Sequence, residues 1–157
     1  MRIGQGIDVH RVSAESDRAL WLGLVRVPDA PGLDGHSDAD VATHALCDAL
    51  LGAANLGDLG RHFPDSDPAF RDVPSRRLLE ATVALVHAQG YHVISGDVTI
   101  IAERPKLAPY LPAMSKELSS VAGATVSVKA TTADGLGALG RVEGIGASAV
   151  VLIEDQA

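Results

Sequence analysis

The sequence predicts an α+β fold in a single domain over residues 1–157, with helices packed on one face of a mixed four-stranded sheet. A chain of this length builds one core and favours one domain. Strand-like and helix-like patterns follow one another in the order β-β-α-α-β-α-β-β. Two strands, 97–102 and 147–153, are apolar at both parities, which indicates burial of both faces. This chain's helices can cover one face, and we expect another subunit to cover the other.

Alternation of side chains supports the predicted strands. In the first, Ile3, Ile7 and Val9 share one parity and glycines and polar residues share the other. The later strands are richer in valine, isoleucine and alanine. The patterns predict strands over residues 2–10, 19–27, 92–103, 125–132 and 147–154.

Helix-starting and helix-stopping residues delimit three predicted helices. The first covers 38–56, rich in alanine and leucine, with Ser37 and Asp38 at its start and Gly57 as its stop. The second begins at Ser75, which we expect to be its N-cap, and Gly90 ends it. The third covers 109–122, and its apolar stripe consists of Leu111, Met114, Leu118 and Val121. Residues 28–34, 58–74 and 135–146 are the predicted loops.

Charge and composition exclude several classes of function. The chain carries 20 acidic and 13 basic side chains, a net charge of −7, and only 3% aromatic residues. Nucleic-acid binding needs a basic footprint or stacking aromatics, so we expect no nucleic-acid partner. No apolar run is long enough to span a bilayer, and residues 1–10 lack a secretory signal pattern. The single cysteine, Cys47, suits a reducing compartment, so we expect a cytoplasmic protein without a membrane partner.

Asp8, His10 and His44 are the strongest candidates for metal ligands. Residues two apart on a strand project from one face, so Asp8 and His10 point the same way. The alternative is a surface aspartate beside a half-buried histidine. In the predicted helix, Asp40, His44 and Asp48 are spaced by four and share a face. A carboxylate one turn away can orient a histidine ligand, although an exposed stripe has the same pattern.

Together these three residues form a set of two histidines and one carboxylate. Three protein ligands leave a fourth position open, which is the arrangement of catalytic rather than structural zinc. Imidazole ligands also favour zinc over magnesium. Cys47 follows His44 by three positions and could add a fourth ligand, but we interpret it as a small buried apolar residue. The sequence therefore predicts an open zinc site.

Two other segments carry groups that can hold phosphates and hydroxyls. Segment 58–67 combines glycine with aspartate and serine side chains, and ordinary turn chemistry is the alternative. Residues 129–134 end a strand in hydroxyls and Asp134, and a glycine-rich stretch follows. Hydroxyls with backbone amides can cradle phosphate oxygens, and an aspartate there can hold Mg²⁺. The alternative is a flexible turn in which Arg141 and Glu143 pair with each other.

Four segments resemble the 2-C-methyl-D-erythritol 2,4-cyclodiphosphate synthase family. They are residues 3–11 (IGQGIDVHR), 35–68 (GHSDADVATHALCDALLGAANLGDLGRHFPDSDP), 97–110 (DVTIIAERPKLAPY) and 126–150 (VSVKATTADGLGALGRVEGIGASAV). The resemblance runs in order over nearly the whole chain, at the family's spacing, and segment 35–68 is its most specific part.

The resemblance implies a phosphorus-oxygen lyase of the non-mevalonate isoprenoid (terpenoid) pathway. The implied substrate is 4-diphosphocytidyl-2-C-methyl-D-erythritol 2-phosphate, whose 2-phosphate attacks the β-phosphorus, closes a cyclic diphosphate and expels CMP. The implied assembly is a homotrimer with active sites between subunits. It also implies one zinc ion per subunit on Asp8, His10 and His44, and Mg²⁺ or Mn²⁺ with the diphosphate on Asp134.

The resemblance further implies roles for individual residues. His36 and Thr132 are implied to stabilise the transition state. Residues implied to hold the methylerythritol phosphate are Asp8, His10, His36, Ser37, Asp58, Leu59, Gly60, Phe63, Pro64, Asp65, Ser66 and Asp67. Residues implied to hold the cytidine diphosphate, from the next subunit, are Ala102, Pro105, Lys106, Leu107, Ala108, Thr131, Thr132, Ala133 and Asp134. Arg141 is implied near the phosphates or the threefold cavity.

Two positions depart from the family pattern. Asp134 stands where the family usually has glutamate, which shortens the reach to magnesium by one methylene. Ala138 stands where relatives often have phenylalanine, so the sequence does not predict an aromatic cavity for an isoprenoid effector. Two other functions remain compatible with the residues: a metal-stabilised trimeric nucleotide-binding module without catalysis, and a metal-dependent phosphoesterase that uses water.

Overall fold

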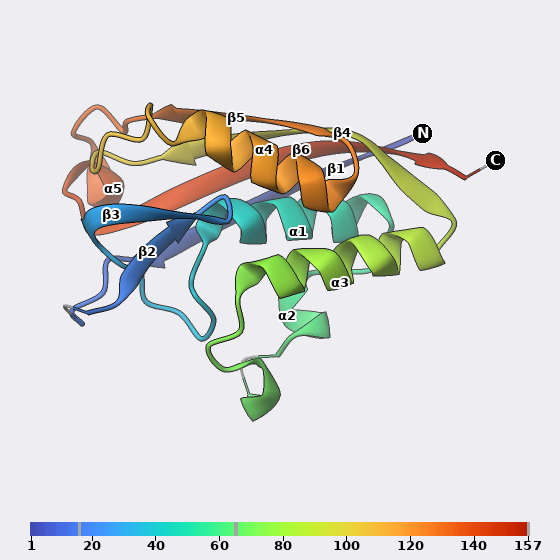
Figure 1. The fold of residues 1–157 in the computed structure, drawn as a ribbon, viewed down its shortest axis with the longest axis horizontal. Helices are drawn as coiled ribbons and strands as arrows, with labels where there is room; N and C mark the ends of the chain where they lie inside the picture. The colour runs from blue at the N-terminus through green and yellow to red at the C-terminus, as the bar shows by residue number, and fades with distance from the viewer. Residues whose placement is uncertain (16, 65, 157) are drawn as a thin grey trace.

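A mixed four-stranded sheet with the strand order β1-β6-β4-β5 forms the centre of the structure (Figure 1). The computed structural model describes residues 1–15, 17–64 and 66–156. The strands are β1 (Arg2–Arg11), β4 (Tyr91–Ile101), β5 (Thr125–Thr131) and β6 (Gly144–Asp155). β6 pairs antiparallel with β1 and with β4, whereas β5 pairs parallel with β4. The sheet class predicted from the sequence is therefore confirmed.

The parallel pair brings two chain segments together at one edge of the sheet. Parallel strands need a crossover connection, and α4 (Leu111–Ala122) supplies it. The register pairs Ile101 at the end of β4 with Thr131 at the end of β5. The loops that follow these strands, from Ala102 and from Thr132, therefore start side by side.

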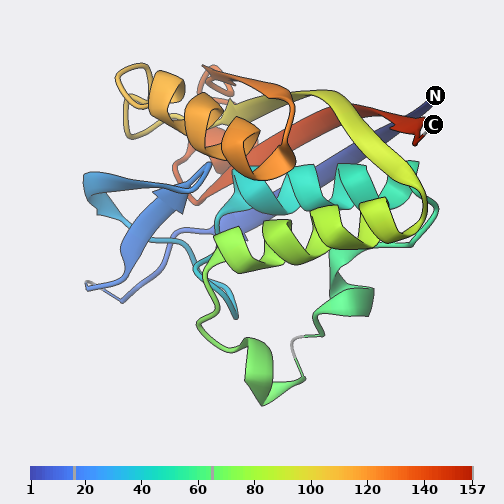
Figure 2. The same ribbon diagram turned by 45° about the vertical axis from the view of Figure 1, so that its right-hand side comes forward.

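The three longer helices lie on the same side of the sheet (Figures 1 and 2). α1 (Val41–Ala53) contacts β1 and β6 on one side and α3 (Ser75–Ala88) on the other, so eleven of its thirteen residues are buried. The apolar stripes of α3 and α4 also face the core, and Leu79 and Leu118 are completely buried. The predicted placement of the helices on one face is confirmed.

Two glycines of β1 allow α1 to lie directly on the strand. A Cβ atom on Gly4 would stand 1.9 Å from the Ala49 carbonyl oxygen, and one on Gly6 would stand 2.1 Å from the Ala45 carbonyl oxygen. No side chain fits at either position unless the helix moves away. This close contact brings the first turns of α1 next to the second half of β1.

The predicted strand over 19–27 is wrong, because the chain turns back within it. The structure has β2 (Ala19–Leu22) and β3 (Val25–Pro31), paired antiparallel in a separate two-stranded sheet. Gly23 and Leu24 form the turn with φ of 57° and 65°. Their N–H groups donate to the buried Asp40 carboxylate at 2.8 and 2.7 Å. A distant carboxylate stabilises this turn, so local composition does not reveal it.

The predicted helix starts differ from the observed ones in their capping residues. α1 begins at Val41, and its N-cap is Asp40, which accepts the Thr43 N–H at 3.1 Å. Ser37 and Asp38 precede the helix and bond elsewhere. Ser75 is the first residue of α3 rather than its N-cap, and its N–H donates to Asp38 at 2.9 Å. The third predicted helix begins at residue 111 instead of 109.

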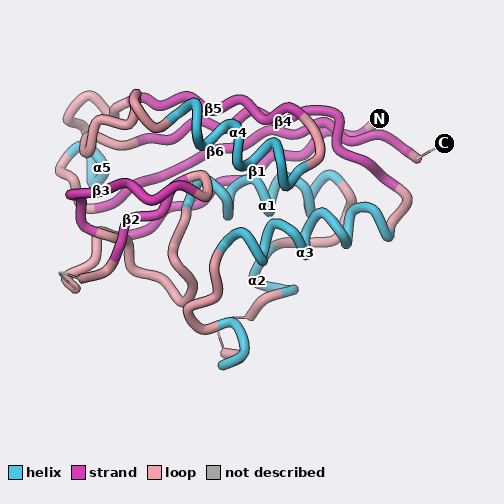
Figure 3. Tube along the Cα trace, in the orientation of Figure 1, coloured by secondary structure: helices cyan, strands magenta, loops and turns pink. Residues whose placement is uncertain are grey.

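The predicted loops contain short helices, which Figure 3 shows among the connecting segments. Segment 58–74 includes α2 (Leu59–His62) and the 3₁₀ turn η1 (Pro68–Phe70), and the glycine-rich stretch includes α5 (Gly137–Gly140). The last strand begins at residue 144, earlier than predicted. One-turn helices are too short to produce a periodic pattern.

Within the described residues, no helix is both long enough and apolar enough to cross a bilayer.

The face of the sheet opposite the helices carries exposed apolar side chains. On β1, Ile3, Ile7 and Val9 alternate outward and are 73%, 61% and 58% exposed. Val150 on the neighbouring β6 is 41% exposed and pairs with Gln5 in the register. These residues define an apolar strip along β1 and β6.

We expect Gly4→Ala to lower the free energy of unfolding by about 3 kcal/mol, because its Cβ would overlap the backbone of α1. Gly52→Ala is the matched control on α1, since its Cβ would meet nothing nearer than 4.0 Å. Alanine also favours a helix over glycine by about 0.5–1 kcal/mol. Chemical denaturation of both variants measures the difference, and equal stabilities would contradict the close contact.

Candidate metal centre and ligand cavities

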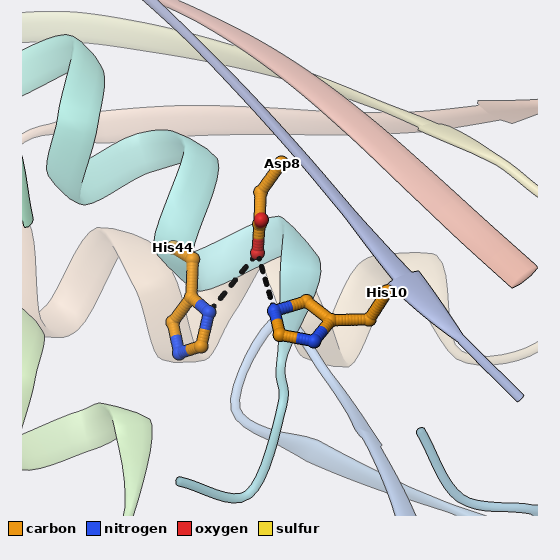
Figure 4. Close-up of side chains that lie close together, drawn as sticks. All are labelled: Asp8, His10 and His44. Atoms are coloured by element: carbon orange, nitrogen blue, oxygen red, sulfur yellow. Dashed lines mark hydrogen bonds and ion pairs between the residues drawn. The ribbon is translucent and has the colours of Figure 1, made fainter. Parts of the chain in front are cut away.

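Asp8 and His10 on β1 converge with His44 on α1 (Figure 4). Asp8 Oδ2 lies 3.0 Å from His10 Nε2 and 3.0 Å from His44 Nδ1. One potential ligand atom from each residue lies within 4.8 Å of the other two. The structure therefore brings together, within reach of one cation, the three residues that the sequence singled out.

The backbone around β1 holds the His10 ring in one orientation. His10 Nδ1 is hydrogen-bonded to the carbonyl oxygen of Asp34. A carbonyl only accepts, so the Nδ1–H group donates to it, and Nε2 is the ring nitrogen that faces Asp8. Gly35 lies against this ring, and a Cβ there would stand 2.9 Å from His10 Cε1.

His44 is oriented by two serines rather than by the carboxylates one helical turn away. Its Nε2 lies 3.1 Å from Ser37 Oγ and 3.0 Å from Ser75 Oγ. The prediction that Asp40 or Asp48 orients this ring is wrong. Asp40 accepts backbone N–H groups at the N-terminus of α1, and Asp48 accepts the Leu59 N–H at 2.7 Å.

The electrostatics of the trio favour a negative carboxylate next to a protonated imidazole. Burial opposes the ionisation of Asp8, but hydrogen bonds with His10 and His44 outweigh it and hold the pKa of Asp8 well below its ordinary range. Burial also disfavours the charged form of His10, yet the hydrogen bond and charge of Asp8 raise the pKa of His10 above its ordinary value. A cation that binds here takes the place of that proton.

The donor set of the trio fits a divalent transition metal. When both rings are neutral, two imidazole nitrogens and one carboxylate oxygen direct their lone pairs at the same space. These lone pairs repel one another unless a cation lies between them. Three such ligands with an open fourth position are typical of catalytic zinc. The residues present therefore fit a zinc ion.

A cavity of about 310 Å³ adjoins the trio. Besides Asp8 and His10, its wall includes five more of the residues implied to bind the methylerythritol phosphate: His36, Ser37, Leu59, Gly60 and Phe63. Among the described residues of this wall, Asp8 and Asp48 are carboxylates and none is a lysine or arginine. An anionic ligand here needs positive charge from a bound cation.

The rest of the implied segment 58–67 does not line this cavity in the described part of the chain. Asp58 accepts the Arg61 N–H at 2.9 Å as the N-cap of α2. Asp67 accepts the Ala69 N–H at 2.9 Å as the N-cap of η1. Pro64 and Ser66 are also outside its wall, and Asp65 lies outside the described residues.

A second cavity, of about 760 Å³, lies beside the loops that follow β4 and β5. Pro105 and Lys106 line it together with Glu103. The Ala102 N–H donates to the Thr131 carbonyl at 3.0 Å and ties the two loops together. The two segments implied to hold the cytidine diphosphate, one after β4 and one after β5, therefore lie next to each other.

Glu103 holds the turn that contains Thr132 and Asp134. Its Oε1 accepts the N–H groups of Ala133 at 2.8 Å and Gly135 at 3.0 Å. The Asp134 N–H donates to Thr132 Oγ1 at 3.3 Å, and its φ is 54°. Of the remaining implied residues, Leu107 is buried and Ala108 is exposed. Arg141 does not line this cavity in the described structure, and its Nε pairs with Glu143 Oε1 at 2.6 Å.

The structure adds residues that sequence reasoning missed. Phe70, an apolar residue in a polar loop, lines the first cavity beside Phe63, with ring centroids 5.4 Å apart. Asp48 lines the same wall. Ser75 carried only a helix-start signal, and nothing in the pattern around Glu103 indicated its contacts with the following loop.

Together, the fold and this centre define a small α+β protein with an open cation site beside a ligand cavity. The model of the YgbB family matches residues 1–154. The chain belongs to this family.

Curated relatives match the chain over nearly its whole length. A protein of Trichlorobacter lovleyi named 2-C-methyl-D-erythritol 2,4-cyclodiphosphate synthase is 54% identical, covering 99% of this chain and 100% of the relative. A protein of the same name from Thioalkalivibrio sulfidiphilus is 54% identical, covering 98% of this chain and 97% of the relative.

Solved structures share the fold. The CDP-bound form of a 2C-methyl-D-erythritol-2,4-cyclodiphosphate synthase superposes with a TM-score of 0.87 at 37% identity, covering 98% of this chain and all of that chain. The CDP complex of Plasmodium falciparum IspF has a TM-score of 0.85 at 29% identity, covering 99% of this chain and 97% of that chain.

We expect the affinity of the metal-free protein for Zn²⁺ to rise with pH and to level off above the raised pKa of His10. Protons compete with the cation for Nε2 until the pH exceeds that value, which lies above the ordinary 6.5. Competition titrations with a chromophoric chelator at about pH 6, 7 and 8 measure the effect. His87→Gln, which removes an exposed histidine of α3, should leave the profile unchanged. A flat profile in the parent protein would contradict His10 as a ligand.

Proposed function

We propose that this chain converts 4-diphosphocytidyl-2-C-methyl-D-erythritol 2-phosphate into 2-C-methyl-D-erythritol 2,4-cyclodiphosphate and CMP, as a phosphorus-oxygen lyase. The family and the names of the full-length relatives support this reaction over a binding module or a water-using phosphoesterase. The observation that carries it is the convergence of Asp8, His10 and His44 beside a cavity whose described wall has no lysine or arginine. We propose a cytoplasmic location, which the single buried thiol of Cys47 supports.

The reaction makes particular demands on the protein. The attacking phosphate already belongs to the substrate, so no side chain has to generate a nucleophile. The protein has to bring two anionic groups together in line and to neutralise the charge that accumulates between them. A chain with a net charge of −7 meets this demand by holding cations.

The first cavity suits the methylerythritol phosphate. When bound to Asp8, His10 and His44, a zinc ion supplies positive charge and Lewis-acid polarisation to a phosphate oxygen. His36 and Ser37 lie on the same wall and are proposed to donate hydrogen bonds to the phosphate, with His36 stabilising the transition state. Leu59, Gly60 and Phe63 on the same wall are proposed to enclose the carbon skeleton and to exclude water, which would otherwise hydrolyse the diphosphate.

The second cavity suits the cytidine diphosphate. Lys106 is proposed to neutralise phosphate charge, and the loop residues around Pro105 contact the base and ribose. Thr132 donates a hydrogen bond to the diphosphate in this proposal. Asp134 holds Mg²⁺ or Mn²⁺ jointly with the diphosphate, since magnesium is often held by one carboxylate plus substrate oxygens.

We further propose that the active protein is a homotrimer in which each active site combines both cavities from neighbouring subunits. Within one chain the two cavities share no described lining residue. The exposed strip of Ile3, Ile7, Val9 and Val150 supports burial of the open sheet face against other copies. We propose that in this assembly the loops after β4 and β5 of one copy lie next to the metal centre of another.

We expect His44→Ala to lose bound Zn²⁺ and to lower kcat/KM for CMP release by roughly 10³-fold. Cys47→Ala is the matched control on the same helix, because its buried thiol is not part of the trio and should leave both properties in place. Metal analysis and phosphorus NMR of the products measure the two effects.

The products of the same assay separate the functions. Normal turnover by a zinc-free His44→Ala protein would refute the proposal. Linear hydrolysis products from the parent protein would favour the phosphoesterase, and tight nucleotide binding without any product would favour the binding module.

We expect Ile7→Asp to convert a trimer into monomers, because a carboxylate in the apolar strip cannot be buried without a partner. Ala84→Asp is the control, since it adds the same charge on the exposed surface of α3. Size-exclusion chromatography with light scattering measures the mass of each. A parent protein that elutes as a monomer would contradict the shared active site.

A further inference from the structure

A chain of hydrogen bonds runs from His44 to the N-terminus of α3, on the side of the ring away from Asp8. His44 Nε2 lies 3.0 Å from Ser75 Oγ, and the Ser75 hydroxyl donates to Asp38 Oδ1. The Ser75 N–H donates to the other carboxylate oxygen of Asp38 at 2.9 Å. Ser75 is completely buried, and Asp38 is half-buried. The proposed reaction uses neither residue.

The positions of the protons give these hydrogen bonds one direction, from His44 through Ser75 to Asp38. An ionised carboxylate can only accept, so the single hydroxyl proton of Ser75 points at Asp38. The lone pairs of Ser75 Oγ are then left to face His44 Nε2, which has to supply the proton of that hydrogen bond. With its proton on Nε2, a neutral His44 carries its lone pair on Nδ1, the atom 3.0 Å from Asp8.

We propose that Asp38 and Ser75 are positioning residues that fix His44 in the tautomer with its proton on Nε2, so that Nδ1 is presented to a divalent cation beside Asp8 and His10. This inference rests on the cation site of the proposed function and adds to it two residues: Ser75 at the start of α3, and Asp38 in the segment before α1. Ligand histidines bind metal more tightly when their other nitrogen has such an acceptor.

Backbone geometry makes the arrangement rigid. Asp38 accepts both the hydroxyl and the N–H of Ser75, which restricts the serine to one rotamer. The same carboxylate lies at the N-terminus of α3, where negative charge is favourable. Ser37 Oγ also lies 3.1 Å from His44 Nε2, but it accepts the Ala39 N–H and, in the described structure, makes no hydrogen bond to the Asp38 carboxylate. The link to a fixed carboxylate therefore passes through Ser75.

Asp38→Asn tests the donor direction of these hydrogen bonds, because the side chain keeps almost the same shape. The Ser75 N–H requires the amide oxygen in the Oδ2 position, so the amide NH₂ takes the Oδ1 position and donates to Ser75 Oγ. The serine hydroxyl then points its proton at His44 Nε2, which opposes the tautomer needed for binding. The long 3.3 Å contact from the Asp40 N–H is also lost. We expect the affinity for Zn²⁺ to fall by about 100-fold.

Ser75→Ala is the second variant. It removes the hydroxyl that accepts from His44 Nε2 and puts no donor in its place. Ser37 remains close to Nε2, so we expect a smaller loss of about 10-fold in Zn²⁺ affinity. Ser75→Thr keeps the hydroxyl and should restore the affinity. Ser13→Ala is the control, because it removes a buried serine that is not part of these hydrogen bonds. The Zn²⁺ affinity of this variant should equal that of the parent protein.

A spectroscopic measurement separates positioning from general loosening. In the zinc-loaded parent labelled with ¹⁵N-histidine, the Nε2–H of His44 should give a hydrogen-bonded resonance protected from exchange. The resonance should persist in Ser75→Thr and lose its protection in Ser75→Ala and Asp38→Asn. Thermal unfolding of the metal-free proteins checks that each variant is folded.

The outcomes distinguish this inference from the proposed function. Parent-like Zn²⁺ affinity in folded Asp38→Asn and Ser75→Ala would overturn the positioning role and leave the proposed function standing. A parent resonance showing the His44 proton on Nδ1 would overturn it even if a variant failed to fold. A parent protein that binds no Zn²⁺ would overturn both.

Discussion

The contact between β1 and α1 determines where the metal centre forms. Glycines at positions 4 and 6 let the helix backbone lie directly on the strand, and a Cβ at either would overlap it. The next inward-facing positions of the same strand are Asp8 and His10, so their side chains extend past the start of the helix. There they meet His44, which is held in place because α1 is enclosed between the sheet and α3.

The distribution of charge explains why a cation is central to the proposed chemistry. The described wall of the cavity beside the trio has carboxylates and no lysine or arginine, although the substrate is a polyanion. A bound divalent cation would bring two positive charges to the point where the phosphate has to lie. Basic side chains that could help, such as Lys106, belong to the other cavity. The location of the metal trio and of Lys106 in different cavities is consistent with the proposed shared site. In that site the 2-phosphate and the diphosphate of the substrate would be held by different copies of the chain.

The two cavities differ in how they are assembled. The first depends on contacts between segments distant in the sequence, since Ser75 of α3 contacts His44 of α1. The second depends mainly on the parallel pairing of β4 with β5, which starts their following loops side by side. Glu103 then fixes the backbone of the second loop through two N–H groups. Substitutions in the core between α1 and α3 are therefore expected to disturb the metal centre more than the nucleotide loops.

The mixed sheet, the helices on one of its faces, and Asp8, His10 and His44 as candidate metal ligands could all be predicted from the sequence alone. Those features follow from periodicity, because side chains two apart on a strand or four apart on a helix share a face. The turn at Gly23 and Leu24 could not be predicted in this way, nor could the orientation of His44 by Ser37 and Ser75 rather than by Asp40. The hydrogen bonds from the turn to Asp40 and between Ser75 and His44 join residues 16 to 31 positions apart, beyond the range of a local sequence pattern. A local sequence pattern shows which hydrogen-bonding groups a segment contains. The packing of segments that are distant in the sequence determines which of these groups bond to each other.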